Sequence, residues 1–104
     1  FRLFLDAGAY DVMMPDVKYV GGISAMIELA EDMRIGGCTF SPHNPSGPVC
    51  HAASLHVCAA ATALQRLEMQ FDETPLFDSL AVPRLSVPRD GAAPVPLDRG
   101  GVWQ

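Results

Sequence analysis

Three side chains of this sequence, Asp16, His43 and Glu68, have the types that proton-transfer chemistry uses. A carboxylate that accepts a hydrogen bond from one imidazole nitrogen fixes the tautomer of the ring and raises its basicity. The other nitrogen is then free to take or give a proton. We therefore interpret Asp16 and His43 as a candidate acid–base pair. Glu68 lies between Leu67 and Met69, and a carboxyl group among apolar neighbours could act as a hydrogen-bond donor.

Each of these residues also has a simpler interpretation. Asp16 could belong to an ordinary Pro-Asp turn, and His43 could be a loop histidine without a catalytic role. The strand pattern alone slightly favours this interpretation. Glu68 could be one polar position in a strand with one wet face, which is the commoner case.

Other titratable residues favour structural interpretations. His51 and His56 are five positions apart in an alanine-rich stretch, so they do not share one helical face as an i, i+4 metal pair would. We interpret them as hydrogen-bonded or surface histidines. Lys18 could reach an acidic ligand, but a solvated loop lysine is the preferred interpretation. No residue of this chain is assigned as a metal ligand.

The elements that position these side chains follow from hydrophobic periodicity and from glycine and proline. Apolar residues at helical spacing predict helices, and short apolar runs bounded by glycine or proline predict buried strands. The predicted helices cover residues 1–7, 23–34 and 49–64, and the predicted strands cover residues 10–17, 38–41 and 66–71.

Helix and strand alternate in this order, which is typical of a parallel sheet with helical crossovers. Asp16, His43 and Glu68 then fall at or near the carboxyl ends of successive strands, where α/β sheets and barrels bind ligands. Three titratable residues at equivalent strand ends are a stronger indication of a site than any one of them alone. Three strands cannot close a barrel, so the pattern predicts part of an open α/β sheet or part of a (β/α)₈ barrel.

The composition fits one compact globular unit. The chain has 104 residues, of which 49% are hydrophobic. Its net charge is −5, so the sequence does not have the basic surface that is typical of nucleic-acid-binding proteins. No apolar run approaches the length of a membrane span, so no membrane contact is expected. Cys38, Cys50 and Cys58 form no CxxC pair, and the last two lie in the alanine-rich stretch. Buried thiols in a reducing compartment, the cytoplasm, are the preferred interpretation.

Three motifs at barrel-repeat spacing resemble the mandelate racemase group of the enolase superfamily. They are Pro-Asp-Val-Lys-Tyr-Val-Gly-Gly at residues 15–22, Ser-Pro-His at residues 41–43 and Leu-Glu at residues 67–68. The resemblance implies the carboxy-terminal portion of a (β/α)₈ TIM barrel at residues 1–80, with about three parallel strands and intervening helices. Residues 81–104 then form an extended Pro/Gly-rich tail, with residues 82–97 as an extended segment or a loose hairpin.

The resemblance also implies roles for the candidate residues. In this group the sixth, seventh and eighth barrel strands end in Asp, His and Glu, which correspond to Asp16, His43 and Glu68. The Asp–His pair acts as general acid or base on the proton α to a carboxylate, and the Glu helps to hold or polarise that carboxylate. An Asp at position 16, where the muconate-lactonizing group has a Lys, favours the mandelate racemase group.

Within the group, residues 41–49 look most like the sugar-acid dehydratases, such as galactonate dehydratase. The implied enzyme takes a small sugar acid, depends on Mg²⁺ and is expected to be a homo-oligomer. Its Mg²⁺ ligands are expected on strands absent from this chain, which begins without Met in what reads as the end of a helix. We therefore expect a fragment that is inactive alone. A racemase or epimerase with the same pair, and a non-catalytic α/β fragment, remain as alternatives.

Overall fold

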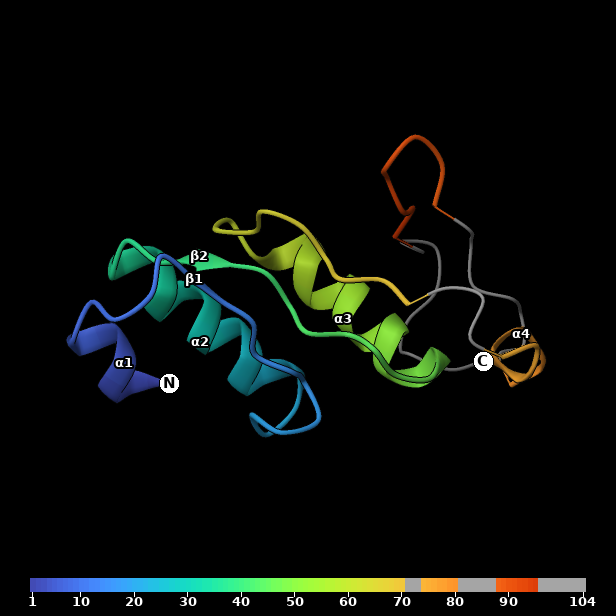
Figure 1. Cartoon of the computed structure of the whole chain (residues 1–104), viewed down its shortest axis with the longest axis horizontal. Coiled ribbons are helices and arrows are strands. Elements are labelled where there is room, and N and C mark those ends of the chain that lie inside the picture. Colours follow the sequence, from blue (N-terminus) through green and yellow to red (C-terminus); the bar gives the residue numbers. More distant parts are fainter. Residues whose placement is uncertain (71–73, 81–87, 96–104) are drawn as a thin grey trace.

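The computed structural model describes residues 1–70, 74–80 and 88–95. In chain order the elements of these residues are α1 (Arg2–Asp6), β1 (Val12–Met13), α2 (Ile23–Ile35), β2 (Thr39–Phe40), α3 (Pro48–Ala60) and α4 (Leu76–Ser79). Figure 1 shows the two strands side by side, with α2 and α3 next to them and with α1 and α4 towards opposite ends of the molecule. None of the described helices is long and apolar enough to cross a membrane.

The two strands pair in parallel, with α2 between them in the chain, as the alternation of elements predicts. Met13 lies opposite Phe40 in the register of the pair. The pairing continues beyond the strands, because Ser41 N donates to Met13 O (3.1 Å) and His43 N donates to Pro15 O (3.0 Å). These hydrogen bonds hold together the two segments that follow the strands.

The third strand expected at residues 66–71 is wrong for the described part of that segment. Leu64 joins β2 only through an isolated parallel bridge. The regular ladder stops there because Pro42 has no N–H group to donate. A side chain replaces it, since Ser41 Oγ donates to the carbonyl oxygen of Arg66 (3.0 Å).

Two other elements end four residues earlier than expected, at residue 13 instead of 17 and at residue 60 instead of 64. The strand predicted at residues 10–17 is reduced to β1, because the chain meets Pro15 and then turns away. The helix predicted at residues 49–64 ends early, because Ala61 takes an extended conformation (φ −83°, ψ 118°) that leads towards the bridge at Leu64.

The core lies where α2 and α3 pack on the strands. Phe40 of β2, Met26 and Met33 of α2 and Val57 of α3 are fully buried, and Ala30 of α2 is nearly so. Helical spacing places Met26, Ala30 and Met33 on one face, as the sequence predicts. This core fixes the two helices against the strands and therefore fixes the loops that carry the candidate site.

A tight hairpin turn lies near the carboxy-terminal end of the described residues. Arg89 and Ala92 form an antiparallel bridge, and the two residues between them have positive φ, 52° for Asp90 and 76° for Gly91. Such angles are typical of a type I′ turn. Of the two alternatives given for residues 82–97, an extended segment or a loose hairpin, the described residues 88–95 contain a hairpin turn. The expected boundary between the barrel part (residues 1–80) and the tail (residues 81–104) borders on residues 81–87, which lie outside the described ranges, so it stays a prediction.

Candidate active site

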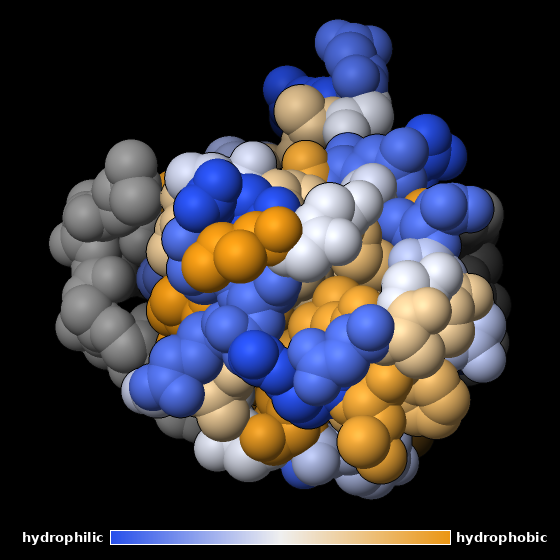
Figure 2. All heavy atoms as spheres, turned by 90° about the vertical axis from the view of Figure 1, so that its left-hand side faces the viewer, coloured by the Kyte–Doolittle hydropathy of each residue, from blue (hydrophilic) through white to orange (hydrophobic). Residues whose placement is uncertain are grey.

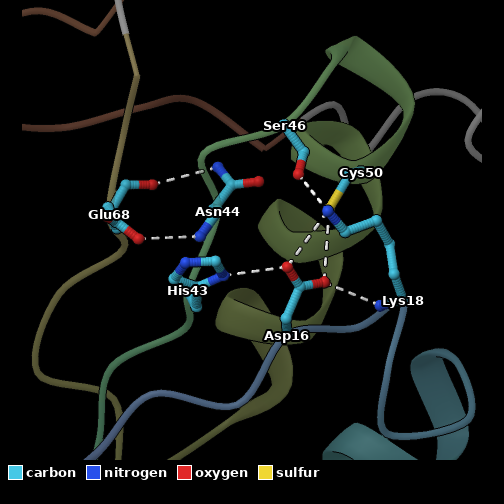
Figure 3. Close-up of polar contacts among 7 residues, drawn as sticks. All are labelled: Asp16, Lys18, His43, Asn44, Ser46, Cys50 and Glu68. Atoms are coloured by element: carbon cyan, nitrogen blue, oxygen red, sulfur yellow. Dashed lines mark hydrogen bonds and ion pairs between the residues drawn. The ribbon is translucent and has the colours of Figure 1, made fainter.

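The segments that follow β1, β2 and the bridge at Leu64 bring Asp16, His43 and Glu68 to the same end of the parallel pair (Figure 3). Asp16 and His43 are in direct contact, whereas Glu68 contacts Asn44, the residue after His43. The placement agrees with the strand-end interpretation. The catalytic roles of the three residues stay predictions.

Asp16 begins a tight turn that keeps its carboxylate inside the protein. The carbonyl oxygen of Asp16 accepts hydrogen bonds from Tyr19 N (3.0 Å) and Val20 N (3.1 Å). The turn ends at Gly21 and Gly22, whose φ angles of 106° and 97° are accessible to glycine but strained for other residues. As a result only 4% of Asp16 is exposed.

The contact between Asp16 and His43 defines the tautomer of the imidazole. His43 Nδ1 lies 3.0 Å from Asp16 Oδ2. Because an ionised carboxylate only accepts hydrogen bonds, Nδ1 carries a proton and donates it. Nε2 is then the free acceptor of the neutral ring. The His43 side chain is 42% exposed, so the ring can meet a molecule from outside.

Lys18 is exposed, as the interpretation as a solvated loop lysine expects, and it also contacts this site. Its backbone N donates to Asp16 Oδ1 (2.9 Å), and its Nζ lies 3.3 Å from Asp16 Oδ2. Nζ also donates to Ser46 Oγ in the loop before α3, and it lies 5.1 Å from the centre of the Tyr19 ring. Lysine and histidine therefore meet the same carboxylate oxygen.

These contacts keep Asp16 ionised. Burial acts to raise the pKa of Asp16, but the hydrogen bonds from His43 and Lys18 outweigh burial and hold that pKa below its ordinary value. Burial likewise acts to lower the pKa of Lys18, and its pairing with Asp16 outweighs this effect and raises that pKa. The thiol of Cys50, with Sγ 3.9 Å from Asp16 Oδ1, is a further neighbour of the carboxylate.

Glu68 is held by the loop that carries His43. Asn44 N donates to Glu68 Oε2 (3.0 Å), and Asn44 Nδ2 donates to Glu68 O (3.0 Å). In addition, Glu68 N donates to Pro42 O (3.2 Å). The carboxylate therefore accepts a hydrogen bond at Oε2, and the possibility that Glu68 acts as a donor stays a prediction for its other oxygen.

Sequence reasoning missed Asn44 and His51 as members of this site. Asn44 Nδ2 lies 2.7 Å from His51 Nδ1, and both residues are almost fully buried. Of the two interpretations given for the histidines, His51 is the hydrogen-bonded one, whereas His56 is partly exposed. The available signal was the apolar character of α3 on all sides, since a polar side chain on such a helix has to find a partner.

The described residues do not fit a magnesium site. Within residues 1–70, 74–80 and 88–95, no three His, Cys, Asp or Glu side chains are placed to hold a metal ion. Mg²⁺ prefers an octahedron of about six oxygen atoms. Asp16 instead has an ammonium, an imidazole and a thiol around its carboxylate.

Comparison with known proteins identifies the family and many curated relatives. Residues 1–101 match the family described as enolase C-terminal domain-like. D-galactonate dehydratase from Ralstonia pickettii (strain 12J) is 35% identical over 57 residues, which are 55% of this chain and 15% of the dehydratase. This chain therefore corresponds to a small part of that relative.

Solved structures agree with this family. An enolase from Agrobacterium radiobacter, provisionally named a galactarate dehydratase and bound to sodium and L-malate, aligns with a TM-score of 0.62 and 34% identity, over 64% of this chain and 17% of its own. A Burkholderia xenovorans (strain LB400) protein, provisionally named an L-alanine-DL-glutamate epimerase and bound to magnesium and fumarate, aligns with a TM-score of 0.83 and 25% identity, over 92% of this chain and 23% of its own. Structures named mandelate racemase/muconate lactonizing enzyme also align. The chain belongs to the enolase C-terminal domain-like family, in its mandelate racemase group, and has the α/β fold of the carboxy-terminal part of that family's barrel.

Proposed function

We propose that this chain is part of a sugar-acid dehydratase in which Asp16 and His43 form the acid–base pair. The observation that carries the proposal is the 3.0 Å contact between His43 Nδ1 and the buried carboxylate of Asp16. It lies at the carboxyl ends of parallel strands, which is the end where barrel enzymes bind their substrates. Relatives named galactonate dehydratase and galactarate dehydratase support the same class of substrate.

His43 Nε2 is the group that moves the proton in this proposal. Asp16 accepts the hydrogen bond of Nδ1–H, which makes Nε2 a better base and stabilises the imidazolium that forms. Depending on the stereochemistry of the substrate, Nε2 takes the proton α to the carboxylate or protonates the leaving hydroxyl. Glu68, fixed by Asn44, is assigned to the substrate side, where it helps to hold the substrate.

The remaining components are placed outside the described residues. We assign Mg²⁺, which such an enzyme uses to neutralise charge on the substrate carboxylate, to ligands elsewhere in a longer protein. The relative solved with magnesium and fumarate supports this assignment. We also propose a cytoplasmic homo-oligomer, and the three free cysteines fit a reducing compartment.

The test uses a full-length enzyme that contains this chain, with a panel of aldonic acids as substrates. The 2-keto product and the exchange of the α-proton in deuterated water are both measured. We expect His43→Asn to lower turnover by about 10²–10⁴-fold, because it removes a positioned acid–base group. His56→Asn, on the partly exposed face of α3, is the matched control and should keep turnover near that of the wild type.

The outcomes separate the proposed function from its alternatives. Exchange without a 2-keto product would assign the pair to a racemase or epimerase, which the epimerase-like relative makes the second candidate. Turnover in His43→Asn that equals the wild type would remove the pair from the mechanism. If neither α-proton exchange nor 2-keto product is detected with any of the acids, the result would favour a non-catalytic role.

A further inference from the structure

A buried polar pair, Asn44 and His51, connects α3 to the candidate site. Only 1% of Asn44 and 2% of His51 are exposed. Asn44 Nδ2 lies 2.7 Å from His51 Nδ1 and 3.0 Å from Glu68 O, while Asn44 N donates to Glu68 Oε2 (3.0 Å). Asn44 therefore contacts both His51 of α3 and Glu68 of the candidate site. It is also the residue that follows His43 in the chain.

The hydrogen-bonding capacity of these groups defines the tautomer of His51. The carbonyl oxygen of Glu68 can only accept, so the Asn44 atom beside it has to be Nδ2 rather than Oδ1. The two N–H groups of Nδ2 then serve Glu68 O and His51 Nδ1, one each. Nδ1 is therefore an acceptor without a proton, and the neutral ring carries its proton on Nε2, which is buried and has no hydrogen-bond partner among the described residues.

The surroundings of His51 favour this neutral form. Burial lowers the pKa of His51 below its ordinary value. The Phe77 ring of α4 packs edge-on against the imidazole, with ring centres 6.2 Å apart, and adds an apolar neighbour. Asn44 is the polar group that faces Nδ1.

We propose that His51 is a positioning residue of the acid–base site, which holds the Asn44 amide through Nδ1 and thereby sets the distance between His43 and Glu68. The inference rests on the proposed function, because it assigns His51 to the same reaction. Among the described residues, the His51 side chain forms no hydrogen bond with Asp16 or His43. Within that part of the chain, Asn44 is the hydrogen-bond partner through which the effect of His51 on the reaction passes.

Loss of the acceptor would leave one N–H group of Asn44 buried without a partner. An unsatisfied buried donor is costly, so the amide would rotate away from Glu68 in search of a new partner. Shifts of about 1 Å in a supporting group lower rates by up to about 10²-fold. The loss should fall mainly on kcat, because a displaced Glu68 beside His43 would still bind the substrate but would no longer hold it in the geometry that proton transfer needs.

The experiment compares two substitutions of His51 in the full-length enzyme. His51→Leu keeps an apolar volume but has no acceptor, whereas His51→Asn can place its Oδ1 where Nδ1 stood. We expect His51→Leu to lower kcat by about 10- to 100-fold with a smaller change in KM, and His51→Asn to recover most of the loss. His56→Leu on the same helix is the control for helix packing. Equal losses in both His51 variants, or no loss in His51→Leu, would overturn the inference.

A second measurement is independent of activity. Nitrogen NMR of labelled histidine should show His51 with Nδ1 unprotonated and Nε2 protonated near neutral pH. The Glu68 carboxyl carbon signal should shift in His51→Leu and return in His51→Asn. A protonated Nδ1, or an unchanged Glu68 signal in His51→Leu, would overturn the positioning role even if the enzyme is a dehydratase. A wild type without α-proton exchange or product would instead overturn the proposed function, and the NMR result would still decide whether His51 orients Asn44 and Glu68.

Discussion

At the scale of single residues, the buried carboxylate of Asp16 organises the site. The backbone and the ammonium of Lys18, the imidazole of His43 and the thiol of Cys50 all lie around it. The Lys18 side chain is 40% exposed, so solvent screens much of its attraction to Asp16. Even so, the ammonium meets the same oxygen as His43. Lys18 therefore shares the negative charge on which the basicity of His43 depends.

We predict that Lys18→Met raises the pKa of Asp16 towards its ordinary value, because the substitution removes the ammonium and leaves burial in place. Carbon NMR of the labelled Asp16 carboxyl group measures this pKa directly. Arg34→Met is the matched control. Arg34 pairs with the exposed Glu31, so this substitution removes the same charge from a different part of the surface. An Asp16 pKa that moves equally in both variants would show that net charge, rather than the ion pair, is responsible.

The same shift has a consequence for stability. Because the pKa of Asp16 is lower in the folded chain, its contribution to stability is present above the ordinary value of 3.8 and is lost as pH falls through the folded pKa. Lys18→Met makes this contribution smaller. The difference in the free energy of unfolding between wild type and Lys18→Met should therefore shrink on acidification below about pH 4. Urea unfolding at several pH values tests this sign.

At the scale of elements, local patterns predicted the helices well and the strands poorly. The helix of residues 23–34 matches α2 almost to its ends, because its apolar face is long and Gly22 precedes it. A strand depends on the donors of its neighbour, which its own residues do not reveal. Pro42 removes a donor beside the expected strand at residues 66–71, so the pairing with β2 is limited to a bridge at Leu64, just before that segment.

The site shows the same division between local and tertiary information. Asp16 and His43 were predicted as a pair because both follow short strands whose parallel pairing is a general rule of alternating elements. The contact between Asn44 and His51 joins a loop to a buried helix face. Its existence depends on how α3 rotates and packs, which periodicity does not define when a helix is apolar all round.

Two methionines allow a matched test of the core. Met26 of α2 is fully buried, whereas Met14, just after β1, is 45% exposed. We predict that Met26→Ala lowers the free energy of unfolding by about 2–5 kcal/mol, because it removes buried contacts and leaves a cavity. Met14→Ala makes the same chemical change and should cost less than about 1 kcal/mol. Urea unfolding followed by circular dichroism measures both. Similar costs at the two positions would contradict the core assigned to α2 and β2.

At the scale of the whole molecule, much apolar surface is uncovered. Figure 2 looks onto the end of the molecule that carries α1 and shows apolar patches among the polar side chains. Large exposed apolar side chains include Leu3, Phe4, Tyr10, Val12 and Ile35. Within the described residues, β1 pairs only with β2, so its other edge presents unpaired backbone groups. Exposed apolar surface beside a free strand edge is a template for association.

We predict that the 104-residue chain by itself is marginally stable and self-associates through this surface. Val12→Lys places a charge on the free edge of β1, where Val12 is 43% exposed, and should reduce association at a cost in stability of under about 1 kcal/mol. Ser24→Lys changes the net charge by the same amount from an exposed position on α2, so it separates the effect of the edge from that of overall charge.

Sedimentation velocity over a range of concentrations measures association, and urea unfolding measures stability. The wild-type chain and Ser24→Lys should show a mass that rises with concentration, whereas Val12→Lys should remain closer to the monomer mass. A wild-type chain that is monomeric at every concentration and unfolds in one sharp transition would contradict this prediction, because its exposed apolar surface would then have no consequence for association or stability.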